Sequence, residues 1–120
     1  MFRYFEEDWE KYEKAYNPKT EATPEQSERL MNFARLVQIS GDSAFGEEIE
    51  SYLDVDQFLR FLAVNVLLSN LDSFLGGSQN YYVYLDPETN RFQLLPWDMD
   101  HSFGPFILVG TLETRPRFTI

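Results

Sequence analysis

One segment constrains the possible fold more than the rest of the chain: residues 80–100, in which two stretches rich in apolar and aromatic side chains flank a polar turn. Such stretches, separated by residues that favour turns, predict a β-hairpin. We expect the strands to be Asn80–Leu85 and Arg91–Trp97, joined by Asp86–Asn90. The first strand therefore opens on an amide side chain, and acidic residues directly follow the second strand.

Helical signals occupy the N-terminal part of the chain. Aromatic residues that recur every three or four positions predict a helix over residues 2–16. Residues 23–26 read Thr-Pro-Glu-Gln, the pattern of a capping box with proline in the first turn, and they predict the start of a second helix. Gly41 is expected to end that helix.

The middle of the chain predicts one further long helix. Residues 42–54 predict a short connection with a single helical turn, and Asp54 at its end should cap the next helix. The run 58–68 is apolar nearly all round, which predicts a central buried helix. Beyond His101 we expect a turn at residues 103–106 and an extended tail. The predicted fold class is α+β, mostly helical, with one β-hairpin.

Composition narrows the functional classes. At 120 residues the chain is expected to be one domain, and its hydrophobic content of 43% is ample for a packed core. The net charge of −10 disfavours nucleic acid as a partner, because an acidic surface repels phosphate backbones. The absence of cysteine excludes disulfides and thiolate metal ligands. No apolar run reaches membrane-spanning length, and the compartment is left open.

Four oxygen-bearing side chains around the hairpin form the candidate site: Asp72, Asn80, Asp98 and Asp100. Phosphoryl transfer requires a cation that bridges the phosphates, hard oxygen ligands for that cation, and a carboxylate that orients the attacking hydroxyl. The hairpin should bring Asn80 beside Trp97, which precedes Asp98. If the backbone stays extended there, Asp98 and Asp100 share a face and can bind one or two cations.

Each of these features also has a plain structural interpretation. Asp72 can cap a loop turn, and the amide of Asn80 can satisfy backbone groups in a turn. Trp97 is expected mainly to pack in the core. His101, the one histidine, is a candidate base or metal ligand whose competing interpretation is structural. Gly76–Gly77 lacks the spacing of a nucleotide-binding loop, so we interpret it as a flexible loop.

Five segments carry a recognisable set of motifs: Asp54–Phe61, Ser69–Asp72, Gln79–Tyr84, Leu95–Asp100 and Phe103–Gly104. Together they resemble the spore-coat CotH kinase family, over roughly residues 50–104. The Asn-aromatic strand and the Pro-Trp-Asp-x-Asp-x-x-Phe-Gly string are the most specific part of the match. Members of that family are atypical, kinase-like proteins of bacterial spore coats, other secreted bacterial proteins and fungal surfaces.

The resemblance implies phosphorylation of protein Ser or Thr residues that depends on ATP and on Mg²⁺ or Mn²⁺. It assigns Asp72 as the catalytic acid that orients the substrate hydroxyl. Asn80 and Asp98 would bind the metal and the nucleotide phosphates, with Asp100 as a neighbouring ligand or a structural acid. The resemblance does not decide whether Asp98 or Asp100 is the primary metal ligand. The fold implied is part of the C-lobe of a kinase-like domain.

The chain also departs from the kinase pattern. No Gly-rich strand–loop–strand with a phosphate-binding lysine precedes the helices, since the lysines at positions 11, 14 and 19 lie in a helix-like or linker segment. We therefore expect a partial domain without its nucleotide lobe, which alone binds ATP weakly or not at all. The alternative is a non-catalytic coat or cell-surface interaction module with a retained cation site. A metal-dependent phosphohydrolase would require more histidine and carboxylate ligands.

Overall fold

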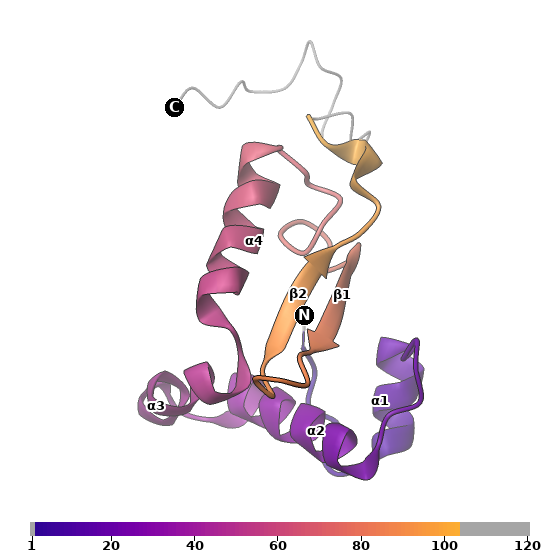
Figure 1. Cartoon of the computed structure of the whole chain (residues 1–120), viewed down its shortest axis with the longest axis vertical. Coiled ribbons are helices and arrows are strands. Elements are labelled where there is room, and N and C mark those ends of the chain that lie inside the picture. The colour runs from indigo at the N-terminus through magenta and orange to yellow at the C-terminus, as the bar shows by residue number, and fades with distance from the viewer. Residues whose placement is uncertain (1, 104–120) are drawn as a thin grey trace.

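The computed structural model describes residues 2–103, and the predicted turn beyond Phe103 and the extended tail lie outside them. Four helices precede a two-stranded antiparallel hairpin and a short 3₁₀ helix, η1, so the α+β prediction is confirmed (Figure 1). The elements are α1 (Trp9–Tyr16), α2 (Pro24–Ile39), α3 (Asp42–Tyr52), α4 (Val55–Leu67), β1 (Tyr81–Leu85), β2 (Phe92–Pro96) and η1 (Met99–His101).

The N-terminal segment is only partly helical, so the prediction of one helix over residues 2–16 is wrong at its start. Asp8 caps α1, and its side chain accepts from the backbone N–H of Lys11. Before the cap, backbone N–H groups bond to tyrosine hydroxyls instead of to a preceding turn. Phe5 N–H donates to the Tyr12 hydroxyl at 2.9 Å. The aromatic spacing is real, but it serves contacts between this segment and α1.

The capping predictions for α2 and α4 are confirmed. Thr23 and Gln26 form a reciprocal capping box at the start of α2, with distances of 3.3 and 2.9 Å. Asp54 Oδ1 accepts from the N–H of Gln57 at 3.2 Å and caps α4. Gly41 follows the end of α2 as expected, although it lies in the extended region and acts as the N-cap of α3. Caps depend on side chains within one turn, which explains why the sequence predicts them well.

The segment 42–52 forms a full helix, α3, where the sequence predicted a connection with a single turn. Its internal glycine, Gly46, lowers the intrinsic helix propensity of the segment, and for this reason the sequence did not predict a full helix there. Tertiary contacts compensate at its C-terminal end. The guanidinium of Arg29, on α2, donates to the Ser51 carbonyl and lies 4.2 Å from the centre of the Tyr52 ring.

The hairpin is where the sequence predicted it, and its register pairs Tyr81 with Pro96 and Leu85 with Phe92. The outer edge of β2 is covered by the start of α4. The side-chain amide of Gln57 donates to the Leu94 carbonyl at 2.6 Å and accepts from the Leu94 N–H at 3.1 Å. This side chain thus substitutes for a neighbouring strand and holds α4 on the sheet.

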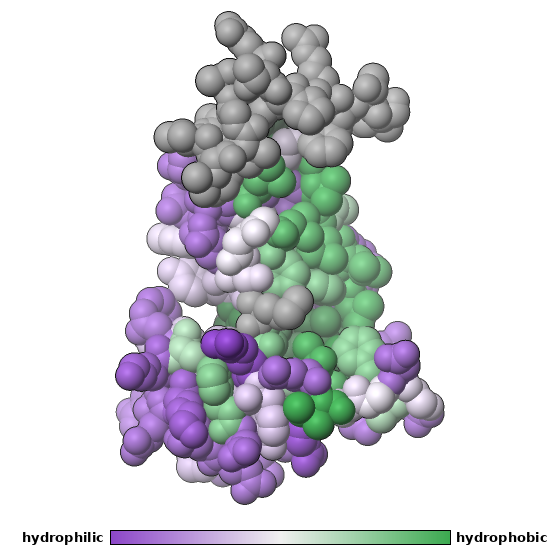
Figure 2. Space-filling view, turned by 180° about the vertical axis from the view of Figure 1, so that it is seen from behind, coloured by the Kyte–Doolittle hydropathy of each residue, from purple (hydrophilic) through white to green (hydrophobic). Residues whose placement is uncertain are grey.

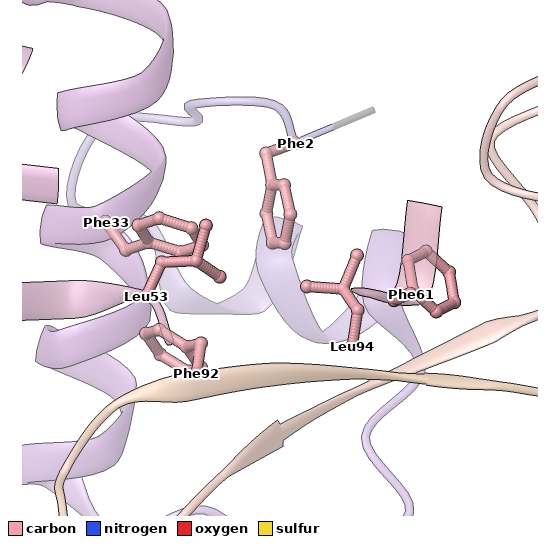
Figure 3. Packing of buried hydrophobic residues seen from close by; sticks show 6 residues of the cluster. All are labelled: Phe2, Phe33, Leu53, Phe61, Phe92 and Leu94. Carbon is pink, nitrogen blue, oxygen red and sulfur yellow. The ribbon is translucent and has the colours of Figure 1, made fainter. Parts of the chain in front are cut away.

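The core joins α2, α4, the hairpin and the N-terminal segment (Figure 3). Phe33 lies at its centre, 1% exposed, with its ring stacked on Phe92 at 5.0 Å and edge-on to Phe2 at 4.9 Å. Burying each such side chain contributes ~1.5–3 kcal/mol of transfer free energy. The buried cluster consists of Phe2, Phe33, Leu53, Phe61, Phe92 and Leu94.

Helix α4 is buried on one side only, so the prediction of a central buried helix is wrong. Phe61 is 5% exposed and packs under the hairpin, whereas Val66 and Leu67 are 65% and 73% exposed. Figure 2 shows the resulting apolar area over α4. Among the described residues, β2 and the ring of Phe74 pack against one face of this helix. None of the helices in this range has the length and apolar character needed to cross a membrane.

Candidate functional site

The loop after α4 brings Asp72 against Asn80, which lies at the entrance to β1. The Nδ2 atom of Asn80 donates to the Asp72 carboxylate at 3.0 Å and to the Asp72 backbone carbonyl at 2.7 Å. Both residues are half-buried. Two side chains eight positions apart in the sequence are therefore held in contact with each other.

This pair fixes the orientation of the Asn80 amide. A flipped amide would place its oxygen against the carbonyl and the carboxylate of Asp72, and three acceptors would then face one another. The Nδ2 atom must therefore point at Asp72, which leaves Oδ1 as the acceptor that Asp72 does not engage. An amide oxygen held in this way is a suitable hard ligand for a divalent cation.

Gln79 is a site residue that sequence reasoning missed. Its Nε2 atom donates to Oδ1 of Asp72, while Asn80 contacts Oδ2. Both oxygens of the carboxylate are thus held by neutral amide donors, which orient the group without cancelling its charge. The signal was present, because Gln79 directly precedes Asn80. It was overlooked because a polar residue at the end of a loop has many ordinary roles.

The pairing of the two strands places Asn80 beside the residues that follow β2. The Trp97 N–H donates to the Asn80 carbonyl at 2.9 Å, which confirms that the two ends of the hairpin meet. Asp98 comes next in the chain, and its side chain is exposed. Asn80 and Asp98 both adopt left-handed backbone conformations, with φ of 57° and 50°. Such conformations are uncommon outside glycine and concentrate at functional sites.

The backbone after β2 is not extended, so the basis on which Asp98 and Asp100 were expected to share a face is wrong. Asp98 is the N-cap of η1, which includes Asp100 and His101. A 3₁₀ turn separates residues two apart by roughly 240° around its axis. Asp100 instead lies near His101, with Oδ1 3.9 Å from Nε2. The metal roles assigned to Asp98 and Asp100 stay predictions.

The described residues around the hairpin do not complete a metal site by themselves. Within residues 2–103, no three histidine or acidic side chains gather closely enough to hold a metal by themselves. A cation here would combine the amide oxygen of Asn80 with carboxylates and phosphate oxygens, as Mg²⁺ commonly does.

The loop that carries Asp72 is held by buried polar groups and by a close backbone contact. The Ser73 hydroxyl, 1% exposed, donates to the Asn70 carbonyl at 2.6 Å. A Cβ atom at Gly76 would lie 1.9 Å from the Leu71 carbonyl oxygen. Gly76 is therefore required by the tight path of the loop, a reason different from the flexibility that the sequence suggested.

Known proteins resemble this chain over most of its length. The family model described as CotH kinase protein matches residues 2–117. Inner spore coat protein H of Bacillus subtilis is 35% identical over 92 residues, which is 77% of this chain and 24% of that protein. Invasin CotH7 of Rhizopus delemar is 31% identical over 94 residues, which is 75% of this chain and 15% of that protein. The chain thus spans about a quarter or less of these curated relatives, and it belongs to the CotH kinase protein family.

Proposed function

We propose that this chain supplies the catalytic-loop part of a protein Ser/Thr phosphotransferase that uses ATP and Mg²⁺ or Mn²⁺. The observation that carries this proposal is the Asp72–Asn80 pair, in which one amide binds both the carboxylate and the backbone carbonyl of the acid. In kinase-like folds an acid that orients the attacking hydroxyl and a metal-binding amide come in this order. The helix, loop and hairpin would then correspond to part of a kinase C-lobe.

Each side chain has a defined role in this proposal. Asp72 accepts a hydrogen bond from the substrate hydroxyl, and the amides of Gln79 and Asn80 keep its carboxylate oriented. Oδ1 of Asn80, together with Asp98 and Asp100, would hold the cation. When bound, that cation neutralises charge that develops on the phosphate oxygens. The left-handed backbone at Asn80 and Asp98 supports a role that outweighs its conformational cost.

The second candidate is a non-catalytic coat or cell-surface interaction module that retains the cation site. The names of the relatives favour it, since one is an inner spore coat protein and another is an invasin. The exposed apolar residues of α4 also suit contact with other proteins. On this proposal the protein would reside in a spore coat, be secreted or lie at a cell surface.

Calorimetric titration with Mg²⁺ and Mn²⁺, with and without ATP, separates the two candidates. The phosphotransferase predicts cation binding that tightens in the presence of ATP and is lost in Asp98→Ala. Asp72→Asn serves as the matched variant. It should keep cation binding in this chain, but a longer form of the protein that carries it should no longer phosphorylate a test protein. Cation binding without coupling to ATP would fit a catalytic-loop part that lacks its nucleotide lobe, and no cation binding at all would favour the interaction module. Full phosphorylation activity in Asp72→Asn would overturn the proposed role of Asp72.

A further inference from the structure

The outer edge of β1 is free of sheet partners in the described part of the chain. Within residues 2–103, β1 pairs with β2 and with no other strand. The opposite edge of the hairpin differs, because Gln57 and the Asp54 N–H bind the backbone of β2 there. One edge of this sheet is therefore covered by its own chain, while the other presents main-chain donors and acceptors.

The phase of the ladder identifies the outward-facing groups. Trp97 N–H donates to Asn80 O at 2.9 Å, and Asp86 N–H donates to Arg91 O at 3.0 Å. Bonded pairs recur at every second residue in an antiparallel ladder, so the even-numbered residues of β1 direct their N–H and C=O groups at β2. The residues that direct theirs outward are Tyr81, Val83 and Leu85.

A groove of about 1020 Å³ is lined on one side by β1 and on the other by the end of α1 and residues 17–22. Lys19 is the one formally charged residue among the described residues that line it, in a chain whose net charge is −10. Aromatic side chains form much of the rest, including Trp9, Tyr16 and Tyr82. A groove with a single charged side chain, beside unpaired backbone groups, is complementary to an extended polypeptide segment of low charge.

The groove is continuous with the candidate site. Gln79 and Asn80, which hold the Asp72 carboxylate, also line its end. We propose that an extended segment of the phosphoacceptor protein pairs with the outer edge of β1 as a third strand. Five residues of such a strand span about 17 Å. The residue that emerges at the Asn80 end then presents its hydroxyl to Asp72. The inference rests on the proposed function for the role of Asp72, but the docking step does not require catalysis.

The test uses this chain without nucleotide or cation, so that it is independent of the phosphotransferase proposal. The probe is a capped nine-residue peptide of alternating valine and threonine with a serine at each end. In one form alternate residues are N-methylated, which prevents self-association and leaves one hydrogen-bonding edge. In the matched control every residue is N-methylated, so the side chains are the same and none of the nine residues keeps a backbone N–H donor.

Binding is followed by amide NMR and hydrogen exchange. We expect the peptide that is N-methylated at alternate residues to bind at least about tenfold more tightly than the fully methylated control, because only the former can donate several main-chain hydrogen bonds to β1. The amides of Tyr81, Val83 and Leu85 should become protected on binding. The amides of Tyr82 and Tyr84 should be protected already. Equal binding of the two peptides, or no binding of either, would overturn the proposal.

Variants at Val83 supply a second readout. The Val83 N–H points away from β2, so Val83→Pro removes an outward donor without removing a hydrogen bond between β1 and β2. Proline is tolerated at such edge positions. Val83→Ala shortens the same side chain and keeps the N–H. We expect peptide binding to fall in the proline variant and to persist in the alanine variant. If the chain dimerises through Tyr81–Leu85, the edge binds a second copy, and the proposal is overturned. If added ATP displaces the peptide, the edge binds a nucleotide, and the proposal is likewise overturned.

Discussion

The two ends of the hairpin differ in how completely their groups are satisfied. At the closed end, residues 85–92 and their contacts on α2 and α3, side-chain hydrogen bonds connect the turn to the neighbouring helices. Arg29 donates to the Asn90 carbonyl at 3.1 Å and to the Ser51 carbonyl. Asp86 accepts from the Thr89 hydroxyl at 2.8 Å within the turn. The core rings of Phe33 and Phe92 lie directly beside it.

The open end, residues 68–81 and 96–103, concentrates the conformational costs. Two buried side-chain oxygens in the described chain have no hydrogen-bond partner, Oδ1 of Asn70 and Oγ of Ser102, and both belong to this end. Left-handed backbone occurs there at Ser69, Ser78, Asn80, Asp98 and Phe103, and at the closed end at Asn90. Strain and unpaired buried groups are typical of functional sites, whereas dense packing is typical of a scaffold. The comparison indicates that the closed end stabilises the fold, and on the proposed function the open end would carry the chemistry.

The largest predicted effect is at the closed end. Phe33→Ala should lower the free energy of unfolding by about 3–5 kcal/mol, because it opens a cavity between Phe2 and Phe92. Urea unfolding monitored by circular dichroism measures the loss. Phe45→Ala on α3 is the matched control, since that ring is 38% exposed and its removal should cost well under half as much. Similar costs for the two variants would contradict the assignment of the core.

The contact that holds α4 on β2 should be next in size. Gln57→Glu keeps the shape of the side chain but removes the amide donor to the Leu94 carbonyl. We expect a loss of about 1–3 kcal/mol, because a carboxylate oxygen then faces that carbonyl. Gln93→Glu adds the same charge to the neighbouring strand and should cost less in the same denaturation experiment. If the two variants are equally stable, the Gln57 contact does not hold the helix.

At the open end, stability and function should separate. Asp98→Gly removes the carboxylate but suits the left-handed backbone, whereas Asp98→Ala removes the carboxylate and keeps a Cβ in that conformation. The glycine variant should therefore be more stable than the alanine variant by about 1 kcal/mol. Both variants should lose cation binding, as measured by calorimetry. A glycine variant less stable than the alanine variant would show that the backbone at Asp98 is not under strain.

The smallest effect concerns acid sensitivity at the closed end. The Thr89 hydroxyl, and then the Glu88 N–H, hold the pKa of the Asp86 carboxyl below its ordinary value. Because this pKa is lower in the folded chain, the turn gains stability above the ordinary Asp range and loses it as the pH falls through the folded pKa. An NMR titration should give a lower midpoint for Asp86 in the native chain than in Thr89→Val. Equal midpoints would exclude the hydroxyl as the cause.

Local signals account for the parts of the fold that the sequence predicted correctly. Thr23 and Asp54 cap their helices as expected, because each cap depends on groups within one turn. The hairpin follows from alternation and turn chemistry. The wrong predictions concern burial and helix extent. Residues 2–8 avoid helix because tyrosine hydroxyls bind their backbone, and α3 extends through Gly46 with the support of Arg29.

The site could be predicted in part from the same kind of signal. The hairpin alone requires Asn80 to meet Trp97, and this meeting is confirmed. The contact between Asn80 and Asp72 depends on the path of the intervening loop, and no residue pattern encoded that path. Gln79 was overlooked for the same reason. The turn at η1 also depends on where the chain leads after β2, so the extended geometry inferred for Asp98 and Asp100 was wrong.

The sequence by itself determined the family, the caps, the hairpin and the residue types available to the candidate site. These properties depend on side chains that are close in the chain or on motifs that are read directly. Tertiary structure decided which amides hold Asp72, which face of α4 is buried and which edge of β1 stays open. Those outcomes depend on how loops and helices pack across long separations in the chain, because burial and hydrogen bonding between distant segments are set by their final positions.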